Sequence, residues 1–408
     1  MTDGEQQVQA QTSEVERLSA AHPEPLERSA AATSDAALFV TPTRYRSGPE
    51  VLPHIGPEAA QLADRVLVAH GEVGWRSVGH RVEASFAGAG IAMATQEHRG
   101  YVTSNAIATL ADAARAANAG ALVAVGGGRV LDAGKAAVDR QGIPCLLVPT
   151  SPATCSGATA VVVDYGEAGG YLGSRRTTAP PAAAVVDTRV LAEAPDRLLV
   201  AGLVDALAKS VEVLSRSAAG QGAAAAAAYA LAREMSAWIW RYAEAAVGAG
   251  PDEAVRQEAA ELAVLWPGLV GGLASEAAKL AAAHPIHNAL THEPRDPAVR
   301  RAIHGEILAY GILVQLVLQG EPDEAARHAG LFARLGCPAD LEALGFGAVA
   351  RDPEALGRTA TRAAAMAPLR AAFPGADAHD VAEAMRAADA VAAEAAATVS
   401  NPTAPRPG

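Results

Sequence analysis

The chain has 408 residues, of which 50% are hydrophobic and 19% are charged. This length predicts two globular domains with sizeable cores, and the net charge of −12 argues against nucleic acid as the main partner, since phosphate binding needs a basic face. The three scattered cysteines form neither a disulfide framework nor a metal-binding pair, which favours a reducing cytoplasm.

Residues 1–40 are polar, acidic and poor in large apolar side chains. We expect a disordered, mobile tail there and no signal peptide, because no basic start precedes an apolar run. No segment reaches about 18 apolar residues without a charge or a glycine–proline break, so no membrane span is expected. Residues 397–408 are predicted to be a second frayed tail.

Residues 41–195 alternate short apolar runs with helical patterns, which predicts a parallel sheet covered by helices, as in a dinucleotide-binding domain. Residues 196–396 carry helical periodicity without a convincing strand, so we expect an all-helical second domain. The predicted fold class is therefore α/β plus all-α. The expected strands are 65–71, 90–95, 121–128, 144–150 and 182–188.

The stretch GGGRVLDAGKAA, residues 126–137, follows one expected strand and opens a helix. Glycines at this place let the backbone approach a phosphate closely, and the helix start offers free N–H groups to it. The usual dinucleotide fingerprint is incomplete, because Leu131 stands where the third glycine belongs. A plain glycine-rich turn is the alternative.

The stretch VPTSPATCSGATAVVV, residues 148–163, follows the next expected strand. A loop of serine, threonine and proline at the end of a parallel strand is where α/β proteins bind ligands. A hydroxyl-rich turn without a ligand is the alternative.

Asp205 lies within a mostly apolar helical segment, where a carboxylate is unfavourable unless it is paired or bound to a metal. Taken alone, it is explained by an ion pair with Lys209, four residues further on.

Four of the eleven histidines fall between residues 284 and 304. His284 and His287 are three apart and share a helix face, whereas His304 begins another helix. Two imidazoles and one carboxylate from three helices can hold a metal and leave a position open for substrate. His292 lies in a polar loop and is expected to be solvated. Ordinary surface or core histidines are the alternative for all four.

The order of these motifs resembles the metal-dependent, iron-containing alcohol dehydrogenase superfamily, and within it the glycerol dehydrogenase branch. The likeness runs from about Tyr45 to at least residue 320. It rests on GGGRVLDAGKA, on VPT with its loop, on VVDTRVLAEAPDRLLVAGLVDALAK, and on AAAHPIHNALT followed by HGE. It implies the dehydroquinate synthase-like fold, with a dinucleotide-binding domain, a helical metal-binding domain and an active site between them.

The resemblance implies roles for individual residues. Asp205, His284 and His304 match the metal ligands, with zinc expected rather than iron. His287 would lie beside the ligands or face the substrate as a catalytic proton relay. Positions expected to line the nicotinamide cofactor are Gly71, Gly126, Gly127, Gly128, Arg129, Val130, Leu131, Asp132, Thr150, Ser151, Thr159, Val161 and Tyr165.

The substrate loop departs from the glycerol dehydrogenase pattern. That branch has an aspartate that binds polyol hydroxyls, and here Cys155 takes its place. A thiol cannot accept two hydroxyl donors as a carboxylate does. The ATC sequence instead resembles hydroxycarboxylate dehydrogenases, whose anionic substrates a fixed carboxylate would repel.

A second departure concerns the cofactor. The acidic residue that binds the 2′-hydroxyl of NAD is expected at the end of the first strand, and Gly71 occupies that place. A glycine leaves room for a 2′-phosphate, with Arg76 as a partner, so NADPH is plausible. A shift of one residue in the alignment would restore NADH through Glu72.

We therefore expect a cytoplasmic, homo-oligomeric NAD(P)-dependent oxidoreductase with one divalent metal, acting on a 2-oxo acid or 2-hydroxy acid. A glycerol or other polyol dehydrogenase and an aldehyde or imine reductase are alternatives. A dehydroquinate-synthase-like cyclase would need a basic cluster, and the VPT and HPIH loops carry none. A non-catalytic scaffold of this fold would have no use for an intact ligand set.

Overall fold

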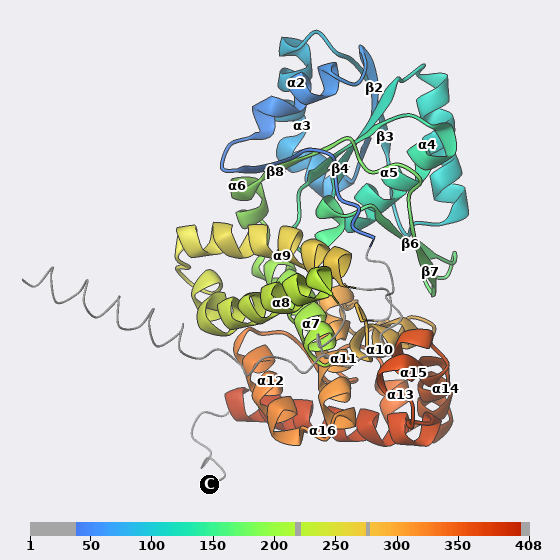
Figure 1. The fold of residues 1–408 in the computed structure, drawn as a ribbon, viewed down its shortest axis with the longest axis vertical. Coiled ribbons are helices and arrows are strands. Elements are labelled where there is room, and N and C mark those ends of the chain that lie inside the picture. The colour runs from blue at the N-terminus through green and yellow to red at the C-terminus, as the bar shows by residue number, and fades with distance from the viewer. Residues whose placement is uncertain (1–37, 217–221, 275–277, 401–408) are drawn as a thin grey trace, which may run out of the picture.

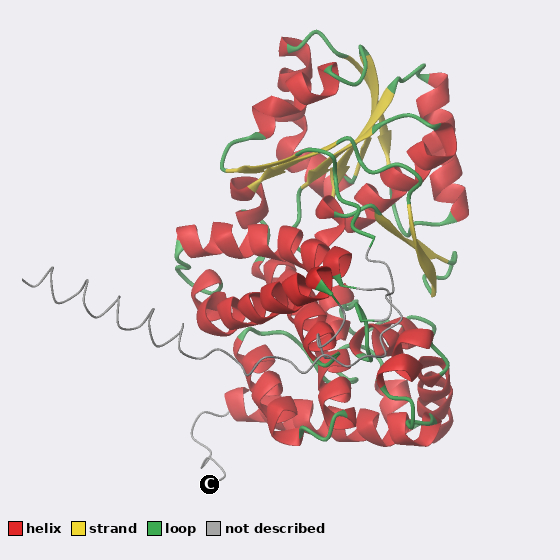
Figure 2. Cartoon of the chain, in the orientation of Figure 1, coloured by secondary structure: helices red, strands yellow, loops and turns green. Residues whose placement is uncertain are grey.

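The computed structural model describes residues 38–216, 222–274 and 278–400. A sheet with its covering helices forms one part of the molecule, and a group of helices forms the other (Figure 1, Figure 2). The predicted tails lie mostly outside the described residues. The last helix, α16 (Ala378–Ser400), continues past residue 396, where frayed chain was predicted, because its alanine-rich end keeps a high helix propensity.

Six parallel strands form the main sheet in the order β1-β8-β5-β4-β2-β3. The predicted strands are confirmed. The edge strand β1 was not predicted, because its sequence is short and polar. The strands are β1 (Tyr45–Gly48), β2 (Arg65–His70), β3 (Ala92–Glu97), β4 (Ala121–Gly126), β5 (Cys145–Pro149) and β8 (Ala183–Asp187).

Helices cover both faces of this sheet (Figure 2). Along β2, Val66 and Val68 belong to one hydrophobic core and Leu67 and Ala69 to the other, as the two-residue period of a strand requires. The covering elements are η1 (Leu52–His54), α2 (Ile55–Ala60), α3 (Glu72–Gly88), α4 (Ser104–Ala116), α5 (Gly128–Gln141) and α6 (Thr188–Ala192).

The 148–163 stretch is not a simple loop. It contains η2 (Cys155–Ala158) and then β6 (Val161–Tyr165), which pairs antiparallel with β7 (Tyr171–Arg176) in a separate hairpin. This correction has a clear cause, because three valines in a row favour a strand and the glycine-rich turn after Tyr165 allows the chain to reverse. The hairpin reaches the helical part, where Thr291 Oγ1 accepts a hydrogen bond from the backbone N–H of Tyr171 at 2.9 Å.

Beyond Asp187 the described residues contain no strand. The division into domains at residue 195 remains a prediction; α7 begins at Asp196. None of the described helices has the length and apolar character that crossing a membrane requires. The helices are α7 (Asp196–Leu214), α8 (Ala223–Tyr242), η3 (Ala243–Ala246), α9 (Glu253–Leu273), α10 (Ala283–Leu290), α11 (His304–Leu318), α12 (Pro322–Arg334), α13 (Gly347–Arg351), α14 (Pro353–Ala364), α15 (Ala367–Ala372) and α16.

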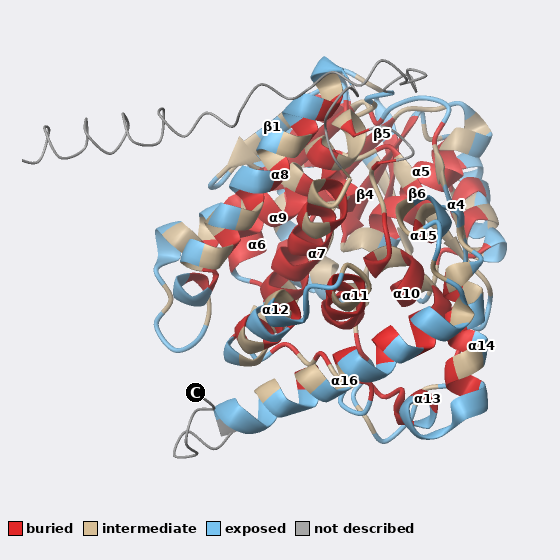
Figure 3. Cartoon of the chain, turned by 60° about the horizontal axis from the view of Figure 1, so that its bottom comes forward, coloured by how far each residue is buried: buried red, intermediate tan, exposed pale blue. Residues whose placement is uncertain are grey.

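Helix α7 lies at the centre of the helical part and is buried along most of its length, with α8, α9 and α11 packed around it (Figure 3). The helical periodicity predicted over 196–396 does not correspond to unbroken helix between α9 and α10. Helix α9 ends at Leu273, after the pair Gly271–Gly272, and α10 begins only at Ala283. Two adjacent glycines weaken a helix, because they lose the most backbone freedom in it. Helix α10 packs against α11 and also contacts α7.

Candidate metal centre and cofactor cleft

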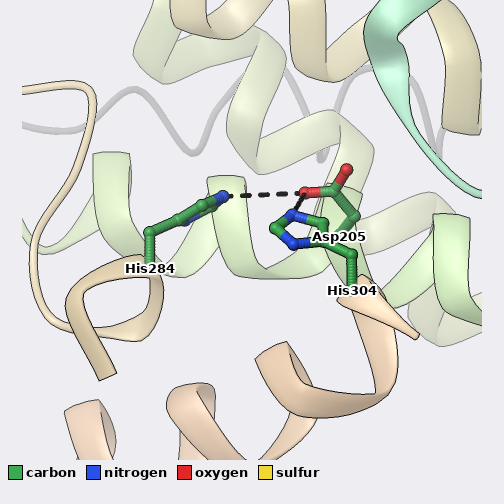
Figure 4. A group of neighbouring side chains, drawn as sticks. All are labelled: Asp205, His284 and His304. Carbon is green, nitrogen blue, oxygen red and sulfur yellow. Dashed lines mark ion pairs between the residues drawn. The ribbon is translucent and has the colours of Figure 1, made fainter. Parts of the chain in front are cut away.

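Three side chains from three helices converge in the helical part (Figure 4). Asp205 comes from α7, His284 from α10, and His304 is the first residue of α11. One ligand atom from each lies within 4.8 Å of the other two. The structure therefore brings together the three residues expected to bind metal.

Their spacing fits an ion between them better than direct bonding. The Nε2 atoms of His284 and His304 lie 3.7 and 3.6 Å from the same oxygen of Asp205. Both distances are too long for a hydrogen bond. Ligands at about 2.0–2.1 Å from a tetrahedral zinc are separated by about 3.3–3.4 Å, so small shifts would complete a site. The donor set of two imidazoles and a carboxylate suits zinc or iron(II).

Close packing of α11 on α7 sets the position of His304. A Cβ on Gly305 would lie only 1.9 Å from the carbonyl oxygen of Ala201, one turn before Asp205. Only glycine allows this approach. In the sequence HGE, the ligand His304 is therefore followed directly by Gly305, which lets α11 approach α7 and the other ligands.

Glu212 binds His284 on the side of the ring opposite to Asp205. It is fully buried, and its Oε2 lies 2.6 Å from Nδ1 of His284. Its Oε1 accepts hydrogen bonds from the backbone N–H groups of Ala281 and His284 at 3.0 and 3.1 Å. An Nδ1–H donated to Glu212 leaves the Nε2 lone pair facing Asp205, which is the arrangement that a metal-binding histidine needs.

His287 supports His304 in the same way. The two rings meet at 2.9 Å between His304 Nδ1 and His287 Nε2, and His287 Nδ1 lies 2.9 Å from Oδ1 of Asn288. Burial and the charge of His304 hold the pKa of His287 well below its usual value, so the ring is neutral near pH 7. A neutral His287 that donates to Asn288 accepts from His304 and orients it. Its role as a proton relay stays a prediction.

The ionisable groups of the metal centre shift one another's pKa values. Burial opposes ionisation of Asp205, but the two imidazoles prevail and hold its pKa well below the usual range. Burial lowers the pKa of His284, and the carboxylates of Glu212 and Asp205 raise it to a net value above normal. Lys209 does not pair with Asp205. Its Nζ lies 3.9 Å from Glu212 instead, so the simple ion pair considered from sequence is not formed.

The glycine turn lies where ligands bind in sheets of this topology. The chain leaves β2 toward β3 and leaves β4 toward β5, in opposite directions, which opens a crevice at the carboxyl ends of β2 and β4. Gly71 follows β2, and Gly126, Gly127 and Gly128 follow β4, with the N–H of Gly71 donating to Val125 O at 3.3 Å. The first turn of α5 presents its free N–H groups here.

Several predicted cofactor residues have partners within the chain. Leu131 is buried in the core, whereas the buried side chain of Val130 packs against Gly71 and Gly126 at the crevice. Arg129 donates to the carbonyl oxygen of Gly100 at 3.3 Å. The Asp132 carboxylate accepts hydrogen bonds from Ser156 Oγ and from the backbone N–H of Val163.

Asp132 and Lys135 fix the loop that follows β5. Lys135 is buried, pairs with Asp132 at 2.9 Å, and donates to the carbonyl oxygens of Ser156, Thr159 and Val161. A buried cation with this many acceptors makes the loop rigid. The sequence singled out both charges but did not show this positioning role.

The rest of the loop lies between the crevice and the metal centre. Thr150 N donates to Gly126 O at 3.0 Å, and Ser151 lies opposite Gly127. The carbonyl oxygen of Pro152 packs so closely on α7 that a Cβ on Gly202 would be 1.9 Å away. Tyr165, at the end of β6, lies 5.3 Å from the ring of Tyr101.

Cys155 begins η2, three residues after Pro152, whose carbonyl oxygen packs on α7 at Gly202. Burial, and then the charge of Asp205, raise the pKa of its thiol to about 12, so it stays neutral. The predicted substrate position is therefore occupied by a neutral thiol.

A family model for iron-containing alcohol dehydrogenases matches residues 47–195. A glycerol dehydrogenase from Escherichia coli is 33% identical over 316 residues, which cover 75% of this chain and 84% of that protein. The chain belongs to the iron-containing alcohol dehydrogenase family. It is thus an oxidoreductase, and its relatives place it in the glycerol dehydrogenase-like branch.

Two further relatives narrow the comparison. Hydroxycarboxylate dehydrogenase A from Escherichia coli is 31% identical to this dehydrogenase over 228 residues, covering 55% of the chain and 62% of that protein. The crystal structure of a probable glycerol dehydrogenase from Sinorhizobium meliloti superposes with a TM-score of 0.76 at 28% identity, covering 88% of this chain and all of that one. The two-domain fold predicted from the motifs is confirmed.

Glu212 is the main residue of this dehydrogenase that sequence reasoning missed. It stands seven residues after Asp205, two helical turns on the same face of an apolar segment. A second buried acid at that spacing was a usable signal, because a single carboxylate on such a face already needs a partner.

Gly127→Val is expected to weaken nicotinamide cofactor binding while the dehydrogenase keeps its fold. Gly127 has φ −80°, and a Cβ there would approach only Ser151, at 3.7 Å, so valine is tolerated in the free protein. The new methyl groups would occupy the space beside the N-terminus of α5. Fluorescence titration with NADPH and NADH should show at least about tenfold weaker binding.

Gly88→Val is the matched control, since a Cβ there meets nothing within 4 Å on the outside of α3. If the Gly127 and Gly88 variants bind the cofactor equally well, the glycine turn is not part of the cofactor site.

Proposed function

We propose that this protein is a metal-dependent, NAD(P)-linked dehydrogenase that interconverts a small 2-oxo acid and its 2-hydroxy acid. Reduction adds a hydride and a proton to the carbonyl group, and oxidation removes both from the alcohol. The observation that carries the proposal is the Asp205, His284 and His304 set with the neutral Cys155 thiol, rather than an acid, close to it.

The ligand set fits one divalent ion, and we propose zinc ahead of iron. The nicotinamide would supply or accept the hydride, and the metal would act as a Lewis acid on the substrate oxygen. Glu212 and His287 orient the two imidazoles, so that both Nε2 lone pairs face Asp205. The first turn of α5 offers N–H groups to the pyrophosphate.

The substrate class follows from charge at the loop after β5. An anionic substrate in this cleft already lies near the carboxylate of Asp205, and a second acid at position 155 would repel it further. Cys155 adds no charge. The 31% identity to hydroxycarboxylate dehydrogenase A supports the same class.

Cys155→Asp is expected to raise activity on glycerol or dihydroxyacetone and to lower it on 2-oxo acids. A charged hydrogen bond to a substrate contributes about 1.5–3 kcal/mol, which corresponds to roughly ten- to a hundredfold in kcat/KM. Steady-state rates on a panel of 2-oxo acids, dihydroxyacetone and simple aldehydes measure both changes.

Cys155→Asn is the control, because it has the shape of aspartate without the charge. If the parent enzyme oxidises glycerol efficiently, or if the Asp and Asn variants keep the parent's preference, the cysteine does not select the substrate. A polyol dehydrogenase is then the better assignment, and the 33% identity to a glycerol dehydrogenase already favours it as the second candidate.

We propose NADPH ahead of NADH as cofactor. Gly71 carries no acid at the end of β2, and the neighbouring Glu72 is held by Arg76 at 2.7 Å, with Arg99 at 3.6 Å. A carboxylate engaged by two arginines is a weak acceptor for a ribose hydroxyl, and both arginines suit a 2′-phosphate. The same rate panel, run with each cofactor, tests this choice. A kcat/KM for NADH more than about tenfold above that for NADPH would contradict it.

The cytoplasm as compartment and homo-oligomerisation remain proposals. The cysteines Cys145, Cys155 and Cys337 are unbonded in the structure, which is compatible with a reducing compartment.

A further inference from the structure

Lys209 is a buried cation that the chemistry described so far does not use. It stands four residues after the ligand Asp205 on α7, so the two side chains leave the helix on the same face, one turn apart. The side chain of Lys209 is only 11% exposed. Its ammonium has three N–H donors, and burying such a group is unfavourable unless acceptors surround it.

The ammonium of Lys209 has weak partners among the described residues. Its Nζ lies 3.4 Å from the carbonyl oxygen of Lys279, which is long for a hydrogen bond, and 3.9 Å from Oε2 of Glu212. That carboxylate is already engaged, because Oε2 contacts Nδ1 of His284 at 2.6 Å and Oε1 accepts two backbone N–H groups. Neither partner therefore satisfies the donors of Lys209.

The buried Lys135 shows what a purely structural ammonium has in this protein. Its Nζ pairs with Asp132 at 2.9 Å and also donates to three backbone carbonyl oxygens of the loop after β5. Lys209 is nearly as deeply buried and has one long hydrogen bond and one distant carboxylate. This contrast indicates that Lys209 keeps donors available for a ligand.

The loop that follows β5 packs on both α7 and α9. The carbonyl oxygen of Pro152 would lie 1.9 Å from a Cβ on Gly202 of α7, and Cγ2 of Thr159 would lie 3.0 Å from a Cβ on Gly268 of α9. Gly202 precedes the ligand Asp205 by about one helical turn. The loop expected to contact substrate and cofactor therefore lies beside the metal centre, against these two helices.

Lys209 lies on the same side of the two helices as this loop. It follows Gly202 by seven residues, which is about two turns of α7 and returns to the same face. Its Cδ and Cε would lie 3.9 Å from a Cβ on Gly271 of α9, about one turn after Gly268. Packing distances thus place Lys209 next to the loop contacts and one turn beyond Asp205.

The charges around the ligand set favour an anion. Asp205 and Glu212 are buried acids of the centre, and Lys209 is the cation beside them. A divalent ion held by the three ligands would leave these groups with one net positive charge. A substrate with a single carboxylate would neutralise that charge, whereas glycerol or dihydroxyacetone would not.

We propose that Lys209 binds the carboxylate of a 2-oxo acid or 2-hydroxy acid whose carbonyl or alcohol oxygen faces the metal ligands. This inference rests on the proposed function and names a residue that selects its substrate class. Residues one turn apart have Cβ atoms about 5–6 Å from each other, so an ion on Asp205 and the ammonium of Lys209 reach neighbouring oxygens of one small molecule. The flexible stem of a lysine lets its ammonium follow the carboxylate.

The proposal is tested with a substrate pair that differs in charge, 2-oxobutanoate and its methyl ester. Lys209→Met keeps an unbranched apolar stem against α9 and removes the ammonium. It should lower kcat/KM for the acid by about ten- to a hundredfold and change that for the ester by less than about threefold. Lys209→Gln is a second variant without the charge and should show the same selective loss.

Arg233→Met is the control, because it removes a positive charge from the exposed side of α8. It should leave the rates on acid and ester unchanged. Thermal unfolding checks that each variant is folded.

A second measurement does not depend on turnover. Titration calorimetry of 2-hydroxybutanoate into the metal-loaded enzyme with reduced nicotinamide follows a complex that has no hydride acceptor. Binding should be at least about tenfold weaker in Lys209→Met than in the parent. Competition with a chelator should show the same metal affinity in both proteins.

The rival role for Lys209 is that of a counter-ion that only supports Glu212. In that case Lys209→Met would weaken metal binding and lower the rates on acid and ester equally, and this result would overturn the subsite. Unchanged acid rates and unchanged binding in both variants would also overturn it, with the proposed function intact. A parent enzyme that reduces the ester but neither reduces nor binds the acid would overturn the proposed substrate class, and the subsite with it.

Discussion

His304→Ala is expected to remove the metal and the activity together. His304 supplies one of the three candidate side-chain ligands found among the described residues, and its Nε2 lies 3.6 Å from the Asp205 oxygen that the other imidazole also faces. Loss of a residue that merely orients a ligand lowers metal affinity by about 10–100-fold, and loss of a ligand should exceed that. Metal content after dialysis and the rate on the best substrate measure the two effects.

His328→Ala is the matched control. His328 is buried and packs against Trp240 and Phe332, away from the ligand set. It should lose stability and keep its metal. Stoichiometric zinc in purified His304→Ala protein would exclude His304 as a ligand.

Glu212→Gln is expected to weaken metal binding by about 10–100-fold with little change in shape. Glutamine can still accept the backbone N–H groups of Ala281 and His284 through its oxygen, but its amide cannot accept the proton of His284 Nδ1 at the same time. The imidazole would then turn or change tautomer, and its Nε2 would no longer be a free ligand. Competition with a chelator of known affinity measures the loss.

Glu293→Gln makes the same chemical change at another buried acid. Glu293 pairs with Arg362 and Arg358 in the helical part and contacts none of the ligands. Its variant should unfold at lower temperature with unchanged metal affinity. If both variants bind metal as the parent does, Glu212 only supports the backbone at the start of α10.

Substrate and cofactor choice depend on fewer interactions than metal binding does. The Cys155 variants are expected to redistribute activity between substrate classes, whereas the His304 and Glu212 variants should reduce it for every substrate. This difference separates errors in the proposed substrate from errors in the proposed chemistry.

Local patterns in the sequence were sufficient for the α/β part. The apolar runs of β4, β5 and β8 end in Gly126, Pro149 and Asp187, and such short, fully buried runs are typical of strands in a parallel sheet. The 161–165 strand was missed because it forms a separate hairpin, whose partner β7 has a polar, half-exposed sequence. The break between α9 and α10 was missed because alanine-rich segments read as helix on both sides of it.

The sequence by itself determined which side chains can bind metal and cofactor, because ligand types and glycines are chemical identities that no packing can change. It also determined the order of the motifs, from which the family resemblance was recognised. The tertiary structure alone decided which charges meet. Glu212 lies 72 residues before His284, so no local period could reveal that the two side chains share one site. Lys209 illustrates the same limit. Its spacing from Asp205 allowed an ion pair between them, but in the structure Lys209 lies near Glu212 instead. Periodicity reports which face of an element is buried, whereas the contacts across that face depend on how the helices cross.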